Sequence, residues 1–309
     1  MQRIKIIAIV GPTASGKTSL GIWLAKNLPA SLRGEIISAD SRQVYKGLNI
    51  GTGKVTKKEM AGVPHHLLDV CSPKKTYTAS DFKKDGEKAL TQILAKNKVS
   101  IIVGGTGLYI DVLLGRIVLP DVPPNPQLRA ILEKKSAEVL FKMLQKKDPR
   151  RAKDIKNKNE QNNKHRLVRA LEIAEALGKS PAGFRADTSK NAKAAYNVLW
   201  LGLNPNEKKL KTNIRTRLLA RVKAGMLAEA KRLHKAGLSY RRMEELGLEY
   251  RSLARLLQHK TTKEAFLLEL ERAIGQYAKR QLRWFTANKE IIWIGSKQEA
   301  LKQVKEFLT

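Results

Sequence analysis

A glycine-rich stretch near the N-terminus has the composition and spacing of a phosphate-binding loop. Residues 11–18, GPTASGKT, fit the pattern G-x-x-x-x-G-K-[ST] and directly follow the apolar run at residues 4–10. In such a loop, successive backbone N–H groups form an anion-binding nest, the lysine adds a positive charge and the threonine hydroxyl can bind Mg²⁺. The residues predicted to bind a phosphorylated group are Gly11, Pro12, Thr13, Ala14, Ser15, Gly16, Lys17 and Thr18.

An acidic residue follows the second strand-like run, at residues 34–39, and this residue is Asp40. In P-loop kinases and hydrolases, a second strand commonly ends in a Mg²⁺-binding acid, but the run at residues 99–105 ends in two glycines here. Asp40 could therefore bind a metal, act as a base on an acceptor, or cap a helix. The polar side chains that follow it, Ser41, Arg42 and Gln43, offer more hydrogen-bonding groups than a cap requires.

These loops need parallel strands to position them, and the first 115 residues alternate short apolar runs with helical stretches in the required way. A proline-rich break at residues 119–126 separates this part from a charged, helical stretch at residues 127–178. Strand-like character returns at residues 196–203. We therefore expect an α/β fold, with a P-loop nucleotide-kinase-like core and a parallel sheet flanked by helices. Residues 1–119 and 196–309 would form this core, and residues 120–195 a mostly helical insertion domain.

The composition points to a polyanionic partner. Sixty Lys and Arg residues against 28 Asp and Glu give a net charge of +32, spread through both halves of the chain. Self-repulsion disfavours such an excess unless a partner such as nucleic acid offsets it. The single cysteine, Cys71, excludes an internal disulfide, and His65 and His66 lack the neighbours of a zinc site. With no apolar run of about 20 residues and no secretory pattern, we expect a cytoplasmic protein without a membrane partner, and a monomer.

Six motifs occur in the order and approximate spacing of the tRNA dimethylallyltransferases, also called tRNA isopentenyltransferases, which the chain resembles between residues 9 and 285. They are GPTASGKT, ISADSRQVYKGLNIGTGK, PHHLLD, VGGTGLYI, RALEI and YAKRQLRWF. The resemblance implies transfer of a dimethylallyl group from dimethylallyl diphosphate to the exocyclic amine of the adenosine 3′-adjacent to the anticodon. It makes the tRNA anticodon arm the partner, with Mg²⁺ beside the diphosphate as the cofactor.

The resemblance also implies a role for individual residues. Asp40 would be the catalytic base, while Lys17 and Arg217 would stabilise the departing diphosphate. The match is loose around Arg217, so Arg215 and Arg221 stay as alternatives. Thr18 would bind the metal. The residues implied to bind tRNA are Asp40, Ser41, Arg42, Gln43, Thr106, Arg129, His165, Arg166, Leu167, Val168, Arg169, Lys279, Arg280 and Arg283.

The chain departs from the family pattern at residues 159–164, 247–250 and 274–275, all in elements expected on the tRNA side. Three other functions fit parts of the sequence. A P-loop kinase that acts on a small molecule or nucleotide would have the same loop at residues 11–18, used there to bind ATP. An RNA-binding P-loop protein would need no transferase activity, and a relative that prenylates free adenine nucleotides would keep the chemistry. The strong positive charge favours RNA as the acceptor.

Overall fold

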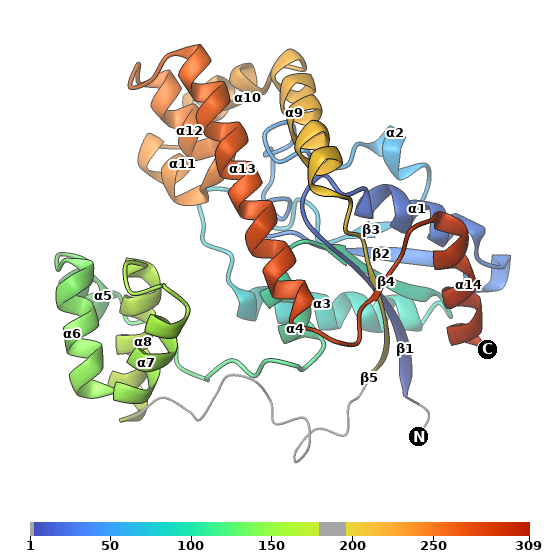
Figure 1. Ribbon diagram of the computed structural model, residues 1–309, viewed down its shortest axis with the longest axis horizontal. Helices are drawn as coiled ribbons and strands as arrows, with labels where there is room; N and C mark the ends of the chain where they lie inside the picture. The colour runs from blue at the N-terminus through green and yellow to red at the C-terminus, as the bar shows by residue number, and fades with distance from the viewer. Residues whose placement is uncertain (1–2, 179–195) are drawn as a thin grey trace. The chain divides into compact units, whose positions relative to one another are not determined.

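The computed structural model describes residues 3–178 and 196–309, and the chain forms two compact units (Figure 1). The larger unit consists of Met1–Leu114 and Lys193–Thr309, and the smaller of Gly115–Ala192. The part of the predicted insertion domain at residues 179–195 lies outside the described residues. Among the described helices, none combines the length and the apolar character that crossing a membrane requires.

A sheet of six parallel strands forms the centre of the larger unit, which confirms the predicted α/β class. The strand order is β3-β2-β4-β1-β5-β6. Because β2 and β4 are buried along their whole length, their sequences are runs of apolar and small residues without alternation, apart from Glu35 of β2. The strands are β1 (Ile4–Val10), β2 (Gly34–Ala39), β3 (His65–His66), β4 (Val99–Gly104), β5 (Tyr196–Gly202) and β6 (Ile292–Trp293).

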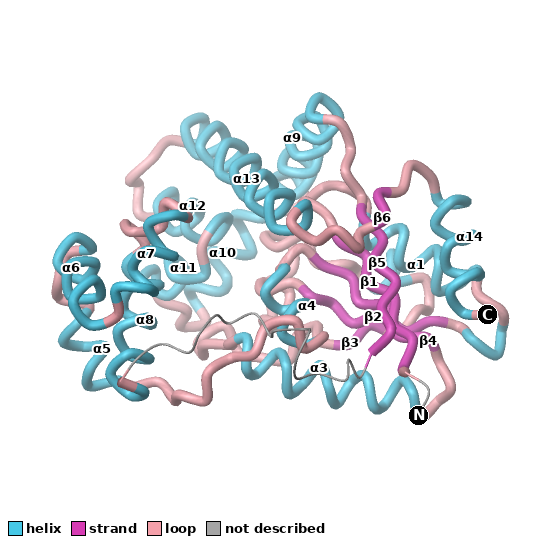
Figure 2. Tube along the Cα trace, turned by 60° about the horizontal axis from the view of Figure 1, so that its bottom comes forward, coloured by secondary structure: helices cyan, strands magenta, loops and turns pink. Residues whose placement is uncertain are grey.

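Helices cover both faces of the sheet (Figure 2). On one face, α1 (Lys17–Asn27) and α14 (Lys297–Leu308) pack against the side chains of β1 that include Ile7. On the other face, α3 (Ala79–Leu94) and α4 (Gly107–Leu113) pack against those that include Ile6. This alternation of Ile6 and Ile7 follows from the two-residue period of a strand.

A helical group follows β5 and completes the larger unit. Its core contains Tyr250, Leu253 and Leu270, all almost completely buried. The last helix of the group begins after Thr262, whose side chain accepts a hydrogen bond from the N–H of Ala265. The helices are α9 (Glu207–Lys223), α10 (Met226–Lys235), α11 (Tyr240–Leu246), α12 (Leu248–Leu257) and α13 (Lys263–Thr286). A helical turn, α2 (Lys57–Met60), and a 3₁₀ turn, η1 (Ala30–Leu32), lie in the loops between strands.

The smaller unit has four helices within its described residues, in agreement with the helical pattern of its sequence. Each begins after a cap residue whose side chain accepts a hydrogen bond from a backbone N–H of the first turn. The cap residues are Asn125, Ser136, Asp148 and Asn163. Leucine side chains from three of the helices fill a separate core. The helices are α5 (Pro126–Leu132), α6 (Ala137–Lys147), α7 (Pro149–Asn157) and α8 (Lys164–Leu177).

Candidate active site at the carboxyl ends of the strands

Loops that carry three of the predicted motifs meet at one edge of the sheet. The phosphate loop follows β1, Asp40 follows β2 and Thr106 follows β4, and these strands are direct neighbours in the order β2-β4-β1. The N–H of Thr106 donates to the carbonyl of Ala39 over 3.1 Å, and the N–H of Ser41 donates to Oγ1 of Thr106 over 3.0 Å. Parallel sheets bind ligands at this edge. The structure therefore brings together motifs that are 65 residues apart in sequence.

The phosphate loop has a backbone conformation that depends on its glycines. Gly11 has φ +143°, and a Cβ atom there would lie 2.3 Å from the carbonyl oxygen of Leu203. Gly16 has φ +93° and precedes α1 without any side-chain cap on the helix. The first N–H groups of α1 are thus left to a ligand, and the positive end of the helix dipole favours an anion there.

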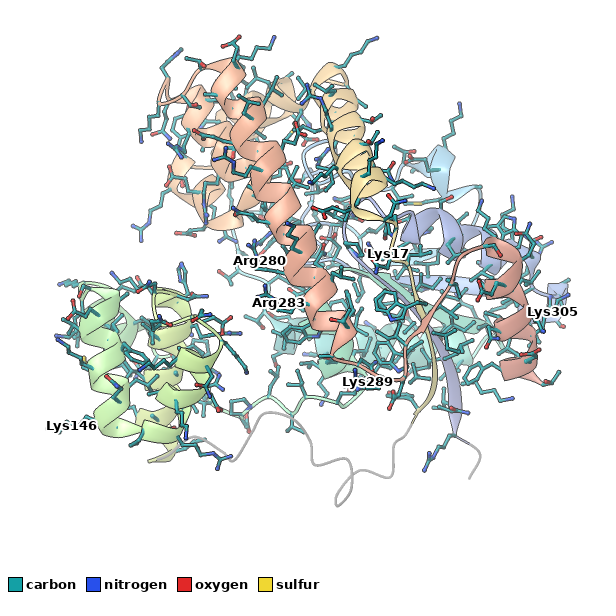
Figure 3. All side chains as sticks on the ribbon, viewed as in Figure 1. Lys17, Lys146, Arg280, Arg283, Lys289 and Lys305 are labelled. Carbon is teal, nitrogen blue, oxygen red and sulfur yellow. The ribbon has the colours of Figure 1, made fainter. Side chains whose placement is uncertain are left out.

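Lys17 is the first residue of α1 and is labelled in Figure 3. Its Nζ donates to the carbonyl of Pro12 over 2.5 Å. The pKa of Lys17 is lowered to about 7, mainly because the ammonium group is removed from solvent; the negative charge of Asp40 raises the pKa and the positive charge of Arg217 lowers it. Lys17, Asp40 and Arg217 therefore act on one another electrostatically within a single site.

The lowered pKa of Lys17 predicts a pH-dependent affinity for diphosphate. Above pH 7 the free protein holds Lys17 mostly neutral, whereas a bound polyanion favours the ammonium form, so binding takes up a proton. The affinity for inorganic pyrophosphate should then fall by up to about tenfold per pH unit between pH 7 and pH 9. Titration calorimetry in buffers of different ionisation enthalpy measures this uptake. Lys17→Met should retain only the pH dependence of the ligand itself, and equal slopes for both proteins would contradict the prediction.

Asp40 organises the turn after β2 with one of its two carboxylate oxygens. Oδ1 accepts from the N–H of Arg42 over 2.8 Å and from the N–H of Gln43 over 3.4 Å. No hydrogen bond from the described part of the chain reaches Oδ2. The residues that follow form a turn instead of an α-helix, so Asp40 is not a helix cap. Within the described residues, no group of three potential metal ligands from His, Cys, Asp and Glu is present.

Three arginines of α9 were candidates for the diphosphate, and their surroundings differ. Arg215 pairs with Glu271 over 2.9 Å and is mostly exposed. Arg221 donates to the carbonyl of Gly51 over 2.6 Å and pairs with Glu249 over 2.9 Å. Arg217 lies within ion-pair distance of no carboxylate in the described part of the chain, and its charge reaches Lys17. This arrangement favours Arg217 as the arginine that meets a ligand.

A buried acid that the sequence analysis missed supports the loop beside Arg217. Glu229 of α10 is 4% exposed, and its carboxylate accepts the N–H groups of three successive residues, 49–51, over 2.8–3.1 Å. The hydroxyl of Tyr250 donates to the same carboxylate over 2.6 Å. A Cβ atom on Gly53, two residues further, would lie 3.1 Å from Nη2 of Arg217. Glu229 is thus a positioning residue for this loop, and the only signal for it in the sequence is an acid within the helix GMLAEA.

One face of α13 borders the site and another is exposed. Tyr277 lies close to the hydroxyl of Thr106; burial and the charge of Asp40 raise the pKa of Tyr277 to about 12. The guanidinium of Arg280 lies 5.8 Å from the centre of the Tyr277 ring. Lys279, Arg280 and Arg283 are all exposed, and Figure 3 shows the last two on the lower half of the helix. The predicted tRNA-binding cations of α13 are therefore accessible.

The predicted tRNA-binding residues of the smaller unit differ in their exposure. Leu167 is fully buried and Val168 is 5% exposed, so their side chains pack in the core of the unit and cannot contact RNA. Arg166 pairs with Glu160, and His165 is exposed. Arg129 and Arg169 both bind the carboxylate of Glu172. The prediction for this segment thus applies to its polar side chains alone.

Glu172 is 1% exposed and binds both Arg129 and Arg169. It also accepts the N–H of Asn125, the residue that caps α5, over 2.6 Å. Burial opposes ionisation, but the hydrogen bonds from Arg129, Asn125 and Arg169 outweigh it and lower the pKa of Glu172 to about 2. The carboxylate therefore fastens α5 to α8 and orients both arginines.

Replacing Glu172 with glutamine should destabilise the smaller unit by about 2 kcal/mol at pH 7, since two arginines would lose their charged partner. Because the folded pKa is depressed, the stabilisation is complete above the unfolded value of about 4.3 and is lost as the pH falls toward 2. The difference in the free energy of unfolding between the parent and Glu172→Gln should therefore become smaller as the pH falls from 5 to 2. Urea unfolding followed by far-UV circular dichroism measures this difference. The matched control Glu138→Gln, which removes an exposed pair with Lys142, should change little.

Comparisons with known proteins identify the family of the chain. The family model described as IPP transferase matches residues 43–288. A tRNA dimethylallyltransferase 2 of Treponema denticola is 44% identical to this chain over 280 residues, which cover 90% of each chain. A tRNA dimethylallyltransferase of Carboxydothermus hydrogenoformans is 38% identical, and the match covers 98% of this chain and 95% of the relative. The crystal structure of a full-length tRNA isopentenylpyrophosphate transferase from Bacillus halodurans is 32% identical and superposes with a TM-score of 0.70, covering 98% of this chain and 95% of that one. A eukaryotic dimethylallyltransferase acting on tRNA superposes with a TM-score of 0.79 at 26% identity, covering 99% of this chain and 79% of that one. The chain therefore belongs to the IPP transferase family, the family of the tRNA dimethylallyltransferases.

Proposed function

We propose that this protein transfers the dimethylallyl group of dimethylallyl diphosphate to the exocyclic amine of the adenosine 3′-adjacent to the anticodon in tRNA. The observation that carries the proposal is the placement of Asp40 beside Lys17 and Arg217. A carboxylate that has one oxygen without a hydrogen bond from the described chain interacts electrostatically with Lys17 of the phosphate loop and with Arg217 of α9. This pairs a base for the acceptor with a binding site for the leaving group.

The reaction breaks the bond between the allylic carbon and the diphosphate oxygen, and forms a bond between that carbon and the amine nitrogen. The electron pair of the broken bond leaves with diphosphate. Lys17, Arg217 and the N–H groups at the start of α1 would stabilise this negative charge.

The amine of adenosine is a poor nucleophile because its lone pair is conjugated with the purine ring. Asp40 would accept a hydrogen bond from this amine at Oδ2 and take up its proton as the new C–N bond forms. Oδ1 stays engaged by the turn, so the carboxylate keeps its orientation while it acts. Positioning of the amine against the allylic carbon would supply much of the remaining rate enhancement.

The residues present fit a Mg²⁺ ion held jointly by protein and substrate. Mg²⁺ in phosphate sites commonly takes one or two protein oxygens together with phosphate oxygens, and the exposed Thr18 offers its hydroxyl in the first turn of α1. A bound Mg²⁺ would supply additional charge stabilisation for the diphosphate. Thr18 would orient the diphosphate through this contact.

The target adenosine lies in a folded anticodon arm, and extruding it costs a few kcal/mol of unstacking. The net charge of +32 and the exposed cations of α13 supply attraction to the RNA backbone that offsets this cost. Arg42 and Gln43, which follow the catalytic base Asp40 in the sequence, would contact the nucleotides that flank the target adenosine. We expect the protein to act as a monomer in the cytoplasm.

The proposal is tested by incubation of the purified protein with dimethylallyl diphosphate and an unmodified anticodon stem-loop. A parallel reaction offers ATP with nucleosides as acceptors. Prenylated RNA together with released pyrophosphate is the expected result. Phosphorylated nucleoside without prenylated RNA would instead identify a kinase. Competition by free AMP separates an RNA acceptor from a nucleotide acceptor, and we expect AMP to compete poorly.

A further inference from the structure

Gln281 is a buried polar residue of α13 that no step of the proposed reaction uses. It is 6% exposed, and its side chain bridges two loops of the site. Oε1 accepts from the N–H of Thr13 over 2.8 Å, and Nε2 donates to the carbonyl of Gly105 over 2.9 Å. Thr13 belongs to the phosphate loop and Gly105 to the turn after β4. One side chain therefore fastens both loops to a helix that is 268 and 176 residues away in sequence.

The packing of α13 on this turn depends on two glycines. A Cβ atom on Gly105 would lie 2.1 Å from Nε2 of Gln281, and one on Gly107 would lie 2.3 Å from Cδ1 of Trp284. Trp284 follows Gln281 by three residues and donates from Nε1 to the carboxylate of Asp111 over 2.9 Å. A side chain at Gly105 would displace the carboxamide of Gln281, and one at Gly107 would displace the ring of Trp284. The glycines of VGGTG thus permit the close approach that the bridge requires.

The bridge acts on the backbone that is predicted to bind diphosphate. A nest of N–H groups binds an anion well only when its peptide planes already converge on one point. The hydrogen bond from the N–H of Thr13 to Oε1 of Gln281 fixes the peptide plane of Thr13. The hydrogen bond from Nε2 of Gln281 to the carbonyl of Gly105 fixes the orientation of the Gln281 carboxamide. Because a buried peptide N–H without a partner is unfavourable, the loop is held in this conformation before any ligand binds.

The same helix has exposed cations on another face, at Lys279, Arg280 and Arg283. Tyr277, one turn before Gln281, contacts Thr106 in the turn after β4. We propose that Gln281 is a positioning residue that holds the phosphate loop in its diphosphate-binding conformation from the helix that meets the RNA. This inference rests on the proposed function, because the ligand of the loop is taken to be the diphosphate of the donor.

The test compares the parent protein with Gln281→Met, which keeps the length and flexibility of the side chain and removes both hydrogen bonds. The affinity for inorganic pyrophosphate with Mg²⁺, measured by calorimetry, should fall about tenfold, as expected for the loss of two neutral hydrogen bonds. The KM for dimethylallyl diphosphate should rise by a similar factor, while the KM for the anticodon stem-loop stays within about twofold. A purely structural loss of folded protein would lower kcat without this separation of the two KM values.

Two further variants make the result specific. Gly105→Ala leaves Gln281 in the sequence but displaces its carboxamide, so it should weaken pyrophosphate binding to a similar extent. Gln298→Met, the matched control, changes an exposed glutamine of α14 and should bind pyrophosphate like the parent. If the parent binds pyrophosphate and both Gln281→Met and Gly105→Ala bind it equally well, the inference is overturned. If the parent does not bind pyrophosphate, the proposed function fails, and this inference fails with it.

Discussion

Replacing Asp40 with asparagine is expected to lower kcat for tRNA prenylation by about 10²–10⁴-fold, the usual contribution of a general base. The amide oxygen of asparagine can still accept the N–H of Arg42, so the turn after β2 should keep its conformation. What the substitution removes is the group that takes the proton from the attacking amine. The KM for the anticodon stem-loop should therefore change much less than kcat, in single-turnover and steady-state assays.

The matched control for this variant is Asp121→Asn, an exposed aspartate of the smaller unit. It should retain the activity of the parent. Thermal unfolding of both variants shows whether the loss of activity is a loss of folded protein. Unchanged kcat in a folded Asp40→Asn protein would exclude Asp40 as the base, and would leave proton transfer to solvent or to the diphosphate.

Replacing Lys17 with methionine is expected to lower kcat/KM for dimethylallyl diphosphate by about 10²–10³-fold. Negative charge grows on the diphosphate as the allylic bond breaks, and removing one preorganised cation typically costs this much. The affinity for the anticodon stem-loop should be nearly unchanged. Burial of the Lys17 ammonium is unfavourable in the free protein, as its pKa of about 7 shows. Removing the ammonium should therefore not reduce the melting temperature of the free protein.

Lys26→Met provides the control for this second variant, because Lys26 is an exposed lysine in the last turn of the same helix. Its kcat/KM should match that of the parent. A Lys17→Met protein that uses the donor as efficiently as the parent would show that the loop does not stabilise the leaving group. A variant with intact donor kinetics but weak tRNA binding would assign Lys17 to the RNA instead.

Much of the fold follows from local sequence signals. The strands β1 and β2 coincide with their predicted ranges, because continuous apolar runs between turn residues are typical of buried parallel strands. The two-residue strand β3 was not predicted. Its His66 looks like a catalytic residue in the motif PHHLLD, yet its Nε2 lies 2.7 Å from the buried carboxylate of Glu35 and so completes a pair within the sheet. No local pattern distinguishes these two roles of a histidine.

The site was predicted as far as its residues lie in contiguous motifs. The phosphate loop and Asp40 could be found because spacing and neighbouring strands mark them. Glu229 and Gln281 could not, since each lies in a helix with many other polar residues and bonds to loops that are 176 or more residues away in sequence. Leu167 and Val168 show the opposite error, because a motif matched as a block included side chains that point into the core.

The central claim is transfer of the dimethylallyl group to the exocyclic amine of one adenosine, and nucleoside mass spectrometry tests it most directly. An unmodified anticodon stem-loop is treated with the protein, dimethylallyl diphosphate and Mg²⁺, digested to nucleosides and analysed by fragmentation. We predict a single prenylated adenosine, with the added group on the exocyclic nitrogen and at the position 3′-adjacent to the anticodon. This product should be absent with Asp40→Asn over the same time. An unchanged nucleoside profile with the parent protein, or a prenyl group on another position, would contradict the account.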